Sequence, residues 1–287
     1  MRVCPVMLFK YLILKVIILA LLVLQPVRAQ QQQQFFDVPF VPTPPVVIEE
    51  MLRLAGVTAK DVVMDLGSGD GRVPITAARL YGARGLGVDL DPDLVAQSIA
   101  AAAEAGVADR VRFQQQDLFK ADLSEATVIT LYLLPGIMAR LNQTLFNLKP
   151  GTRLVSHDFR LGEWQPDAVT QIRKNTFLWI VPAKVAGAWR FETTLPGKPG
   201  LELDLRQKFQ EIDGYGRFSG RHALMWEAKL RGERITFALV DDRDRDNEAT
   251  LYFEGRVEGD VMEGQVRRGT GKAQTVHSWR AVRVAAK

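Results

Sequence analysis

The 287-residue sequence is poor in cysteine, and this shortage excludes several kinds of chemistry. Its single cysteine, Cys4, precedes the first apolar run, in a segment that we expect to be removed from the mature chain. A mature chain without cysteine has no disulfide, no thiol nucleophile and no cysteine-ligated metal. The acid-rich stretch at 241–248 lacks the glycine and the glutamate of a calcium loop, and no Ser/His/Asp arrangement of hydrolase type is present, so we expect no metal site.

An excess of charge of one sign is also missing once the first 29 residues are set aside. The whole chain has 37 Lys and Arg against 33 Asp and Glu. The first 29 residues hold four of the basic residues and no acidic ones, which leaves 33 of each sign. A neutral chain without a basic stripe gives no support to nucleic-acid binding, so we expect no nucleic-acid partner.

The N-terminal apolar run is short. Its nine residues, VIILALLVL at 16–24, are too few to span a bilayer. Basic residues precede the run, and Val27 and Ala29 follow it at the −3 and −1 places of a signal-peptidase site. We therefore expect residues 1–29 to be a signal peptide that exports the chain to the periplasm or another extracytoplasmic compartment. The alternative is an uncleaved segment, residues 11–27, anchoring the chain to the inner membrane, which is the only membrane contact that we expect.

After a Gln-rich spacer at 30–37, apolar strands alternate with helical patterns. We expect Thr43 to cap a first helix that begins at Pro44. The expected strands cover 62–66, 85–90, 111–117, 126–134, 152–159 and 176–182, with helices at 72–81, 91–105 and 137–148 between them. This alternation predicts an α/β domain over 38–186, a Rossmann-like, doubly wound and mostly parallel sheet of seven strands.

From about Gly187 the helical periodicity disappears. The remaining sequence alternates apolar and polar residues in short segments that Gly-rich or Asp-rich turns separate at hairpin spacing. These segments cover 188–195, 201–210, 224–230, 234–239, 249–257, 261–267 and 278–284. We expect a smaller, all-β second domain over 187–287, an antiparallel meander or barrel.

The strand at 62–66 leads into the loop DLGSGDG at 65–71. Glycine at 67, 69 and 71 lets the backbone turn sharply and lets a ligand approach the main chain. The spacing differs from the G-x-G-x-x-G of dinucleotide sites, and Asp65 and Asp70 flank the turn where a pyrophosphate would have to lie. The loop therefore favours a ligand that carries an ammonium group.

Two more carboxylates fall at the ends of the next strands. Asp89 ends the second strand, where it can accept hydrogen bonds from both hydroxyls of a ribose. Asp117 ends the third strand and can accept from an adenine amino group, with Leu118 beside the ring. Ammonium, ribose diol and adenine amine together describe S-adenosyl-L-methionine, which we expect as cofactor. The expected cofactor-binding residues are Asp65, Gly67, Ser68, Gly69, Gly71, Asp89, Leu90, Asp117 and Leu118.

These stretches resemble the seven-β-strand protein-lysine methyltransferases, especially the small archaeal broad-specificity enzymes and the mitochondrial lysine methyltransferases. The matching segments are VPFVPTP at 38–44, VVMDLGSGDGRVPITAA at 62–78, GLGVDLDP at 85–92, DLFKADLSEATVITLYLLP at 117–135 and GTRLVSHDF at 151–159. The resemblance implies an S-adenosylmethionine-dependent methyltransferase (EC 2.1.1.-) with the cofactor residues named above. It also implies that Tyr132, Leu133 and Pro135 line the entrance for the methyl acceptor, and that Phe40 and Thr43 help to close the site.

Tyr132 is the candidate catalytic residue, as a wall of the channel in which an acceptor amine loses its charge, and an aromatic in the core of the strand is the competing interpretation. The turn there is not the NPPY type used for adenine or amide nitrogens, which argues against those acceptors. His157 is a candidate general base, and a structural histidine is the competing interpretation. The sequence predicts a protein lysine side chain as acceptor. A methyltransferase of a small molecule or envelope component, and a non-catalytic protein that binds the cofactor and acts through its β-domain, are the alternatives.

Overall fold

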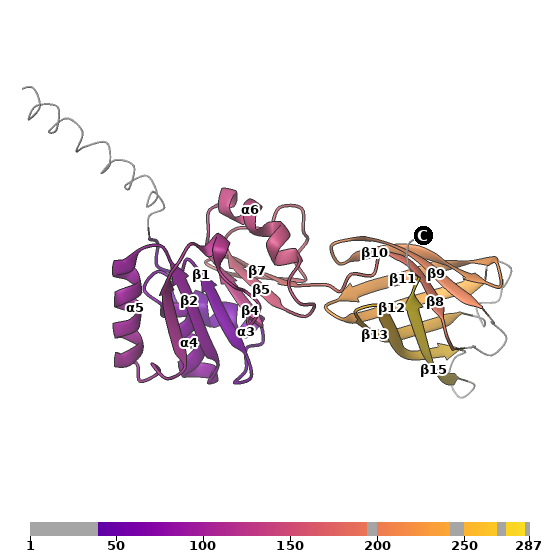
Figure 1. Ribbon diagram of the computed structural model, residues 1–287, viewed down its shortest axis with the longest axis horizontal. Coiled ribbons are helices and arrows are strands. Elements are labelled where there is room, and N and C mark those ends of the chain that lie inside the picture. Colours follow the sequence, from indigo (N-terminus) through magenta and orange to yellow (C-terminus); the bar gives the residue numbers. More distant parts are fainter. Residues whose placement is uncertain (1–39, 194–199, 242–249, 269–273, 285–287) are drawn as a thin grey trace, which may run out of the picture. The chain divides into compact units, whose positions relative to one another are not determined.

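The computed structural model describes residues 40–193, 200–241, 250–268 and 274–284 (Figure 1). The expected signal peptide at 1–29, the spacer at 30–37 and nearly all of the acid-rich stretch at 241–248 lie outside these residues. Within the described ranges, no helix is long and apolar enough to cross a membrane. All of the described helices and strands belong to one compact unit, Thr43–Lys287.

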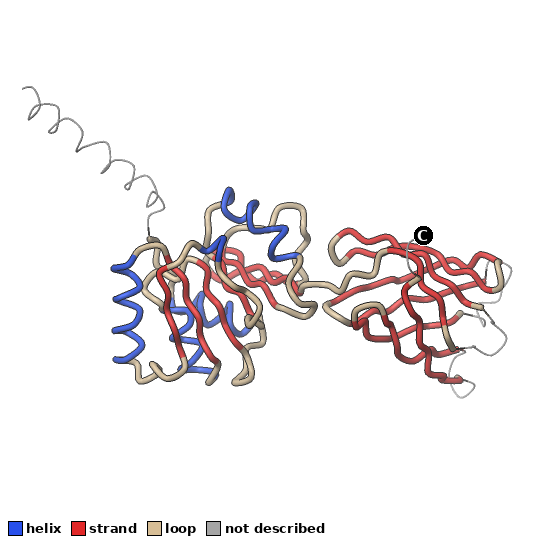
Figure 2. Tube along the Cα trace, in the orientation of Figure 1, coloured by secondary structure: helices blue, strands red, loops and turns tan. Residues whose placement is uncertain are grey.

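The first domain is a seven-stranded sheet with helices on both faces (Figure 2). Its strand order is β3-β2-β1-β4-β5-β7-β6. Strands β1 to β5 are parallel, β7 pairs antiparallel with β5, and β6 pairs antiparallel with β7. The strands are β1 (Val62–Leu66), β2 (Arg84–Asp89), β3 (Val111–Gln115), β4 (Val128–Leu131), β5 (Arg153–His157), β6 (Ala168–Ile172) and β7 (Lys174–Ile180). The helices are α3 (Pro45–Leu54), α4 (Arg72–Tyr81), α5 (Pro92–Glu104), the short 3-10 helix η1 (Leu118–Lys120) and α6 (Pro135–Phe146). This confirms the predicted Rossmann-like, mostly parallel sheet.

The two faces of the sheet have separate cores. Met64 of β1 packs in one cluster with Met138 and Leu141 of α6. Its neighbour Val63 packs in another with residues of α3 and α4, among them Val47. Successive side chains of a strand point to opposite faces, so one buried strand supports helices on both sides.

Two parts of this domain differ from the sequence prediction. The edge strand β6 was not predicted, because its alternating half-buried and exposed residues carry little apolar signal. The fourth strand was predicted too long: β4 ends at Leu131, and α6 already begins at Pro135. Leu134, before that proline, is extended, since a residue before proline is disfavoured in helical conformation.

The predicted helix cap at Thr43 was wrong. Helix α3 begins at Pro45, and its N-cap is Pro44, without a side-chain hydrogen bond. Pro44 is extended (φ −61°, ψ 143°) because the proline that follows it excludes the helical conformation, so the helix starts one residue later than predicted. Thr43 is instead buried, and its carbonyl accepts a hydrogen bond from Arg72 Nη1 at 3.0 Å.

The second domain is a closed antiparallel barrel of eight strands in the described residues. Its strands are β8 (Gly187–Phe191), β9 (Leu201–Lys208), β10 (Glu211–Phe218), β11 (Arg221–Arg231), β12 (Arg234–Asp241), β13 (Leu251–Glu258), β14 (Val261–Arg268) and β15 (Thr275–Arg283). The expectation of an antiparallel meander or barrel is thus confirmed as a barrel. Strand β10 was missed because Gly214 and Gly216 interrupt its apolar pattern. At Gly214 a Cβ would lie 2.1 Å from the Asp204 carbonyl oxygen, so the gap in the pattern has a steric cause.

Side chains fill the barrel. Trp189, Phe237, Phe253 and Trp279 are each at most 3% exposed and belong to one apolar cluster with residues of every strand of the barrel. The ring centroids of Phe237 and Phe253 are 4.6 Å apart, and those of Phe253 and Trp279 are 5.7 Å apart. The interior is therefore a packed hydrophobic core.

The turn between β9 and β10 carries an aromatic side chain into the core of the α/β domain. Phe209 stacks on Trp164, with ring centroids 5.5 Å apart, and meets Phe146 of α6 edge-on at 5.3 Å. Next to it, Gln210 Nε2 donates to the Gln165 carbonyl at 2.6 Å.

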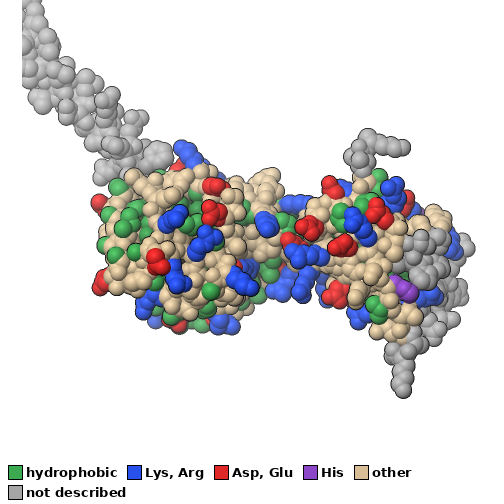
Figure 3. Space-filling model, turned by 60° about the horizontal axis from the view of Figure 1, so that its bottom comes forward, with side chains coloured by type: hydrophobic (Ala, Val, Ile, Leu, Met, Phe, Trp, Pro, Cys, Tyr) green, Lys and Arg blue, Asp and Glu red, His purple; other side chains and the backbone are tan. Residues whose placement is uncertain are grey.

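On the face of the α/β domain that Figure 3 shows, Lys and Arg side chains are interspersed with Asp and Glu side chains, so this face does not gather one sign of charge.

Candidate cofactor and acceptor site

The loop between β1 and α4 turns through three glycines with left-handed backbone. Their φ angles are +77° at Gly67, +53° at Gly69 and +78° at Gly71, values that other residues adopt only with strain. At Gly71 a Cβ would also come within 2.6 Å of the Phe113 ring. Since Gly67 is exposed, a ligand at the carboxyl edge of the sheet can approach the loop's main chain there.

Asp65 is the buried carboxylate of this site. It is the fourth residue of β1 and lies directly opposite Thr130 of β4, whose hydroxyl donates to its Oδ1 at 2.5 Å. Burial raises the pKa of the Asp65 carboxyl to about 7, the Thr130 hydrogen bond opposes the rise, and the negative charges of Asp89 and Asp70 add to it. A carboxyl group with this pKa is about half protonated near neutral pH, and a bound cation would stabilise its ionised form.

Asp70 is already neutralised by Arg72. Their side chains form an ion pair at 2.5 Å, and Arg72 also donates to the Thr43 carbonyl. Burial raises the pKa of the Asp70 carboxyl, but the hydrogen bonds and charge of Arg72 outweigh it and leave that pKa lowered. Arg72 therefore compensates the charge of Asp70. Within the described residues, no cation donates a hydrogen bond to Asp65.

Asp89 holds the glycine loop. It ends β2, its Oδ2 accepts the Gly69 amide at 2.8 Å and its Oδ1 accepts the Asp91 amide at 3.0 Å. Each carboxylate oxygen has a further acceptor site, so both oxygens can still take ribose hydroxyls. Leu90 beside it is 38% exposed and offers an apolar surface at the same strand end.

Asp117 lies just beyond β3 and caps the 3-10 helix η1. Its Oδ1 accepts the Phe119 amide at 3.0 Å, and Lys120 lies 3.9 Å from the other oxygen. Both Asp117 and Leu118 are half-buried. The three aspartates predicted for the cofactor thus lie at or next to the carboxyl ends of the neighbouring strands β1, β2 and β3.

Ser68 is placed differently from a ligand-facing residue. Its amide donates to the Val88 carbonyl at 3.0 Å, and its Cβ lies 2.8 Å from the position of a Cβ on Gly87 of β2. The hydroxyl is buried and has no hydrogen-bond partner in the described part of the chain. Ser68 therefore anchors the loop to β2 through its backbone.

The segment after β4 is the one predicted to line the entrance for the methyl acceptor. Leu133 is buried, and a Cβ on Gly67 would lie 3.0 Å from its Cδ2, so this segment adjoins the cofactor loop. The partly exposed ring of Tyr132 lies 4.7 Å from the His157 imidazole and 6.2 Å from the nearly parallel Phe159 ring. Pro135 is exposed at the start of α6, and Phe40 is 45% exposed.

Two residues contact the candidate site in ways that the sequence did not predict. Thr130 is a hydroxyl in an otherwise apolar buried strand, and pairing β4 with β1 puts it opposite Asp65, so strand order alone could have identified it. Phe113 packs behind the glycine loop, within 2.8 Å of the Cβ positions of both Gly71 and Gly87. The only sequence signal for it is an aromatic in β3 opposite a glycine of β2.

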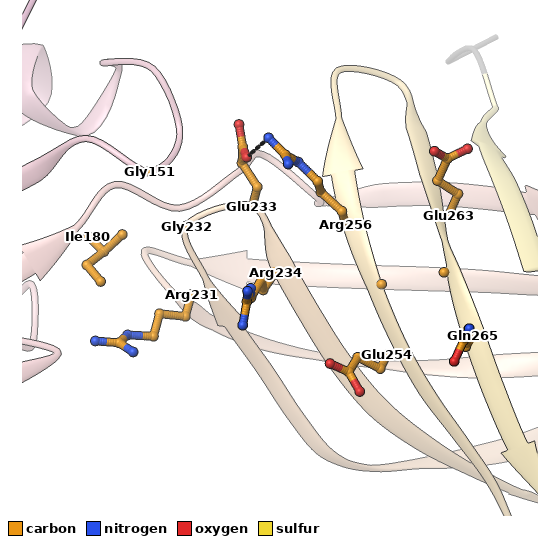
Figure 4. A pocket seen from close by; sticks show the side chains of 12 residues that line it. Gly151, Ile180, Arg231, Gly232, Glu233, Arg234, Glu254, Arg256, Glu263 and Gln265 are labelled. Atoms are coloured by element: carbon orange, nitrogen blue, oxygen red, sulfur yellow. Dashed lines mark ion pairs between the residues drawn. The ribbon is translucent and has the colours of Figure 1, made fainter. Parts of the chain in front are cut away.

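A hollow of about 690 Å³ lies away from the carboxyl edge of the sheet (Figure 4). Gly151, just before β5, marks it as lying toward the amino ends of the parallel strands, opposite the glycine loop. Charged side chains of both signs line it, and Arg256 is paired with Glu233 at 2.5 Å. In Figure 4 the guanidinium of Arg231 extends away from the strands that carry Glu254 and Glu263.

Comparison with known proteins finds relatives that match the α/β domain. A model of the ANTKMT methyltransferase domain matches residues 65–168. A protein-lysine N-methyltransferase of Saccharolobus islandicus is 40% identical over 152 residues, which is 52% of this chain and 94% of that protein. The mouse adenine nucleotide translocase lysine N-methyltransferase is 36% identical over 136 residues, 46% of this chain and 58% of that protein. The matched region thus spans little more than half the length of the mouse protein.

A solved structure also matches half of the chain. It is the crystal structure of an RNA methyltransferase from Salinibacter ruber in complex with S-adenosyl-L-homocysteine. Its sequence is 54% identical, the TM-score is 0.49, and the match covers 50% of this chain and 96% of that chain.

Proposed function

The chain belongs to the class I S-adenosylmethionine-dependent methyltransferases related to archaeal protein-lysine N-methyltransferase, and from this premise we propose that its methyl acceptor is a lysine side chain of a protein. The observation that carries the proposal is the 40% identity that extends over 94% of the archaeal enzyme. A match over 152 residues is much longer than the glycine loop at 65–71, so it covers more of the domain than cofactor binding alone needs.

The residues at the carboxyl edge suit the cofactor. S-adenosylmethionine supplies, when bound, a methyl group on a positively charged sulfur. The Asp65 carboxylate lowers the cost of holding a positive ligand, Asp89 offers two acceptor oxygens to a ribose, and Asp117 offers one to an adenine amine. The glycine loop admits the ligand to the main chain.

The acceptor end suits an amine that must lose its charge. A lysine side chain has a pKa near 10.4 and attacks only as the neutral amine. Tyr132, Phe159 and Leu133 give this end an aromatic and apolar wall, which disfavours the charged ammonium. Holding the neutral amine in line with the methyl–sulfur bond then supplies much of the rate.

The test is a labelling experiment. The purified protein is incubated with methyl-labelled S-adenosylmethionine and a fractionated cell extract, beside an Asp89→Ala variant. We expect label in protein, assigned to lysine by mass spectrometry, and none with the variant. Label only in small molecules or lipid would support the alternative acceptor class, and label in RNA would contradict the protein acceptor. Cofactor binding without any label would favour a non-catalytic role.

For its location, we propose that residues 1–29 export the protein. The support is the order of basic residues, apolar run and small residues at the −3 and −1 places. N-terminal sequencing of protein from the extracytoplasmic fraction should begin at Gln30. A start at Met1 in the membrane fraction would instead favour the uncleaved anchor at 11–27.

A further inference from the structure

His157, for which the sequence leaves a general base and a structural histidine both open, is a buried titratable residue beside Tyr132. It ends β5 and is 4% exposed. Its Nδ1 is buried and has no hydrogen-bond partner in the described part of the chain. A buried polar atom without a partner lowers the stability of the folded protein, so a phenylalanine would suit this position better if the ring only filled space.

Contacts connect this imidazole with the cofactor loop. A Cβ on Gly67 would lie next to Leu133. The preceding residue, Tyr132, lies beside His157 because β4 and β5 are paired. The imidazole therefore lies behind Tyr132, on the same edge of the sheet as the expected cofactor. Tyr132 is partly exposed, so an acceptor side chain can reach its ring, and the imidazole lies next to that ring.

Burial leaves the imidazole of His157 neutral at physiological pH. Burial lowers the pKa of His157; Asp158 raises it, Lys174 lowers it and the Asn175 backbone raises it, and the sum is a lowered pKa. Asp158 adopts a left-handed backbone (φ +70°), and its carboxylate forms an ion pair with Lys174. The remaining titratable neighbour is the Tyr132 phenol, whose ring lies beside the imidazole.

We propose that His157 accepts the proton which the acceptor amine must lose before methyl transfer, an inference that rests on the proposed lysine acceptor. The ammonium of the acceptor gives its proton to Nδ1 of His157. The lone pair freed on nitrogen forms the N–CH3 bond while the C–S bond breaks, and the electron pair of that bond stays on sulfur. The imidazolium then releases its proton to water.

The experiment compares pH profiles of methyl transfer at saturating cofactor, with poly-L-lysine as the probe. In the wild type the imidazole takes the proton, so the rate should change less than about threefold between pH 7 and 9. His157→Phe keeps an aromatic ring beside Tyr132 but has no proton acceptor. Its rate should be at least about 100-fold lower at pH 7 and rise about tenfold per pH unit, as more of the free lysine becomes neutral.

The barrel offers a matched control. His222 lies 5.3 Å from the ring of Tyr215, a similar pair far from the glycine loop in sequence, and His222→Phe should keep the wild-type profile. His157→Gln, which keeps a polar side chain, should behave like His157→Phe. Unchanged cofactor affinity and an undiminished melting temperature would show that both His157 variants are folded.

Two results would overturn the inference. One is a wild-type profile in His157→Phe; the other is a uniform loss at every pH, which belongs to a structural residue. A wild type that methylates no lysine at all would instead contradict the proposed function, and the inference would fall with it.

Discussion

The buried carboxylate of Asp65 makes cofactor binding depend on pH. Burial raises its pKa to about 7 in the free protein, and a bound cation draws the ionised form back toward its ordinary range. The protein must therefore release the proton of Asp65 when it takes up S-adenosylmethionine. Because the bound state holds fewer protons than the free one, affinity rises with pH.

The magnitude follows from the fraction of Asp65 that is protonated. With a pKa of about 7, the apparent Kd is raised by a factor of about 11 at pH 6, about 2 at pH 7 and only about 1.1 at pH 8. The Kd at pH 6 should thus be about tenfold higher than at pH 8, which corresponds to about 1.4 kcal/mol. About half a proton should be released per cofactor bound at pH 7.

Isothermal titration calorimetry in two buffers of different ionisation enthalpy measures both quantities. Asp65→Asn resembles the protonated carboxyl, so its affinity should be as weak as that of the wild type at low pH and nearly independent of pH. Any titration of the cofactor itself appears in both proteins and cancels. The reasoning is refuted if wild type and variant show the same pH dependence, or if no proton leaves at pH 7.

The same shift affects the stability of the free protein. An acid whose pKa is raised by folding disfavours the folded state once the unfolded chain ionises, that is above its ordinary pKa of 3.8. Relative to Asp65→Asn, the wild type should lose about 2 kcal/mol of unfolding free energy between pH 5 and 7, and little more above that range. Urea unfolding at each pH measures this difference, and parallel curves for the two proteins would contradict it.

Three substitutions test other parts of the structure. Thr130→Val removes the hydrogen bond that opposes the raised pKa of Asp65, so the pH at which cofactor affinity is half-maximal should move upward in the same calorimetric titration. Gly71→Ala combines a left-handed φ with a clash against Phe113, and urea unfolding should show a loss of about 2 kcal/mol together with weaker cofactor binding. Phe209→Ala removes a half-buried ring from the α/β core and should cost about 2 kcal/mol in urea unfolding without changing cofactor affinity; an unaltered midpoint would contradict the packing role.

Much of the cofactor edge could be predicted because its determinants are local. Helix α4 was predicted at its observed limits, 72–81, since a glycine turn precedes it and Gly82 ends it. Asp91 and Pro92 likewise mark the start of α5, where Asp91 accepts the Asp93 amide. Parallel strands bring their carboxyl ends to one edge, so residues after successive strands become neighbours without further information.

What sequence reasoning missed depends on contacts between distant segments. The state of Asp65 is set by Thr130, 65 residues away, and by the burial of both. The missing partner of His157 Nδ1 is a property of everything packed around it, so the sequence left a general base and a structural histidine both open. The failure to predict strand β10 has the same origin. Its glycines make room for the neighbouring strand β9, but in the sequence they resemble turn residues.

The packed interior of the barrel narrows what the second domain can contribute. In small closed barrels the interior is either filled by side chains or left open for a ligand, and here four large aromatic residues occupy it. An acceptor or a lipid therefore does not fit inside without displacing the core. A partner can therefore contact only the outer surface of the barrel, where Trp226 is 57% and Tyr252 is 43% exposed. The turn at Phe209 packs beside α6. Because α6 begins directly after Tyr132 and Leu133, the barrel meets the α/β domain through the same helix that the acceptor segment leads into.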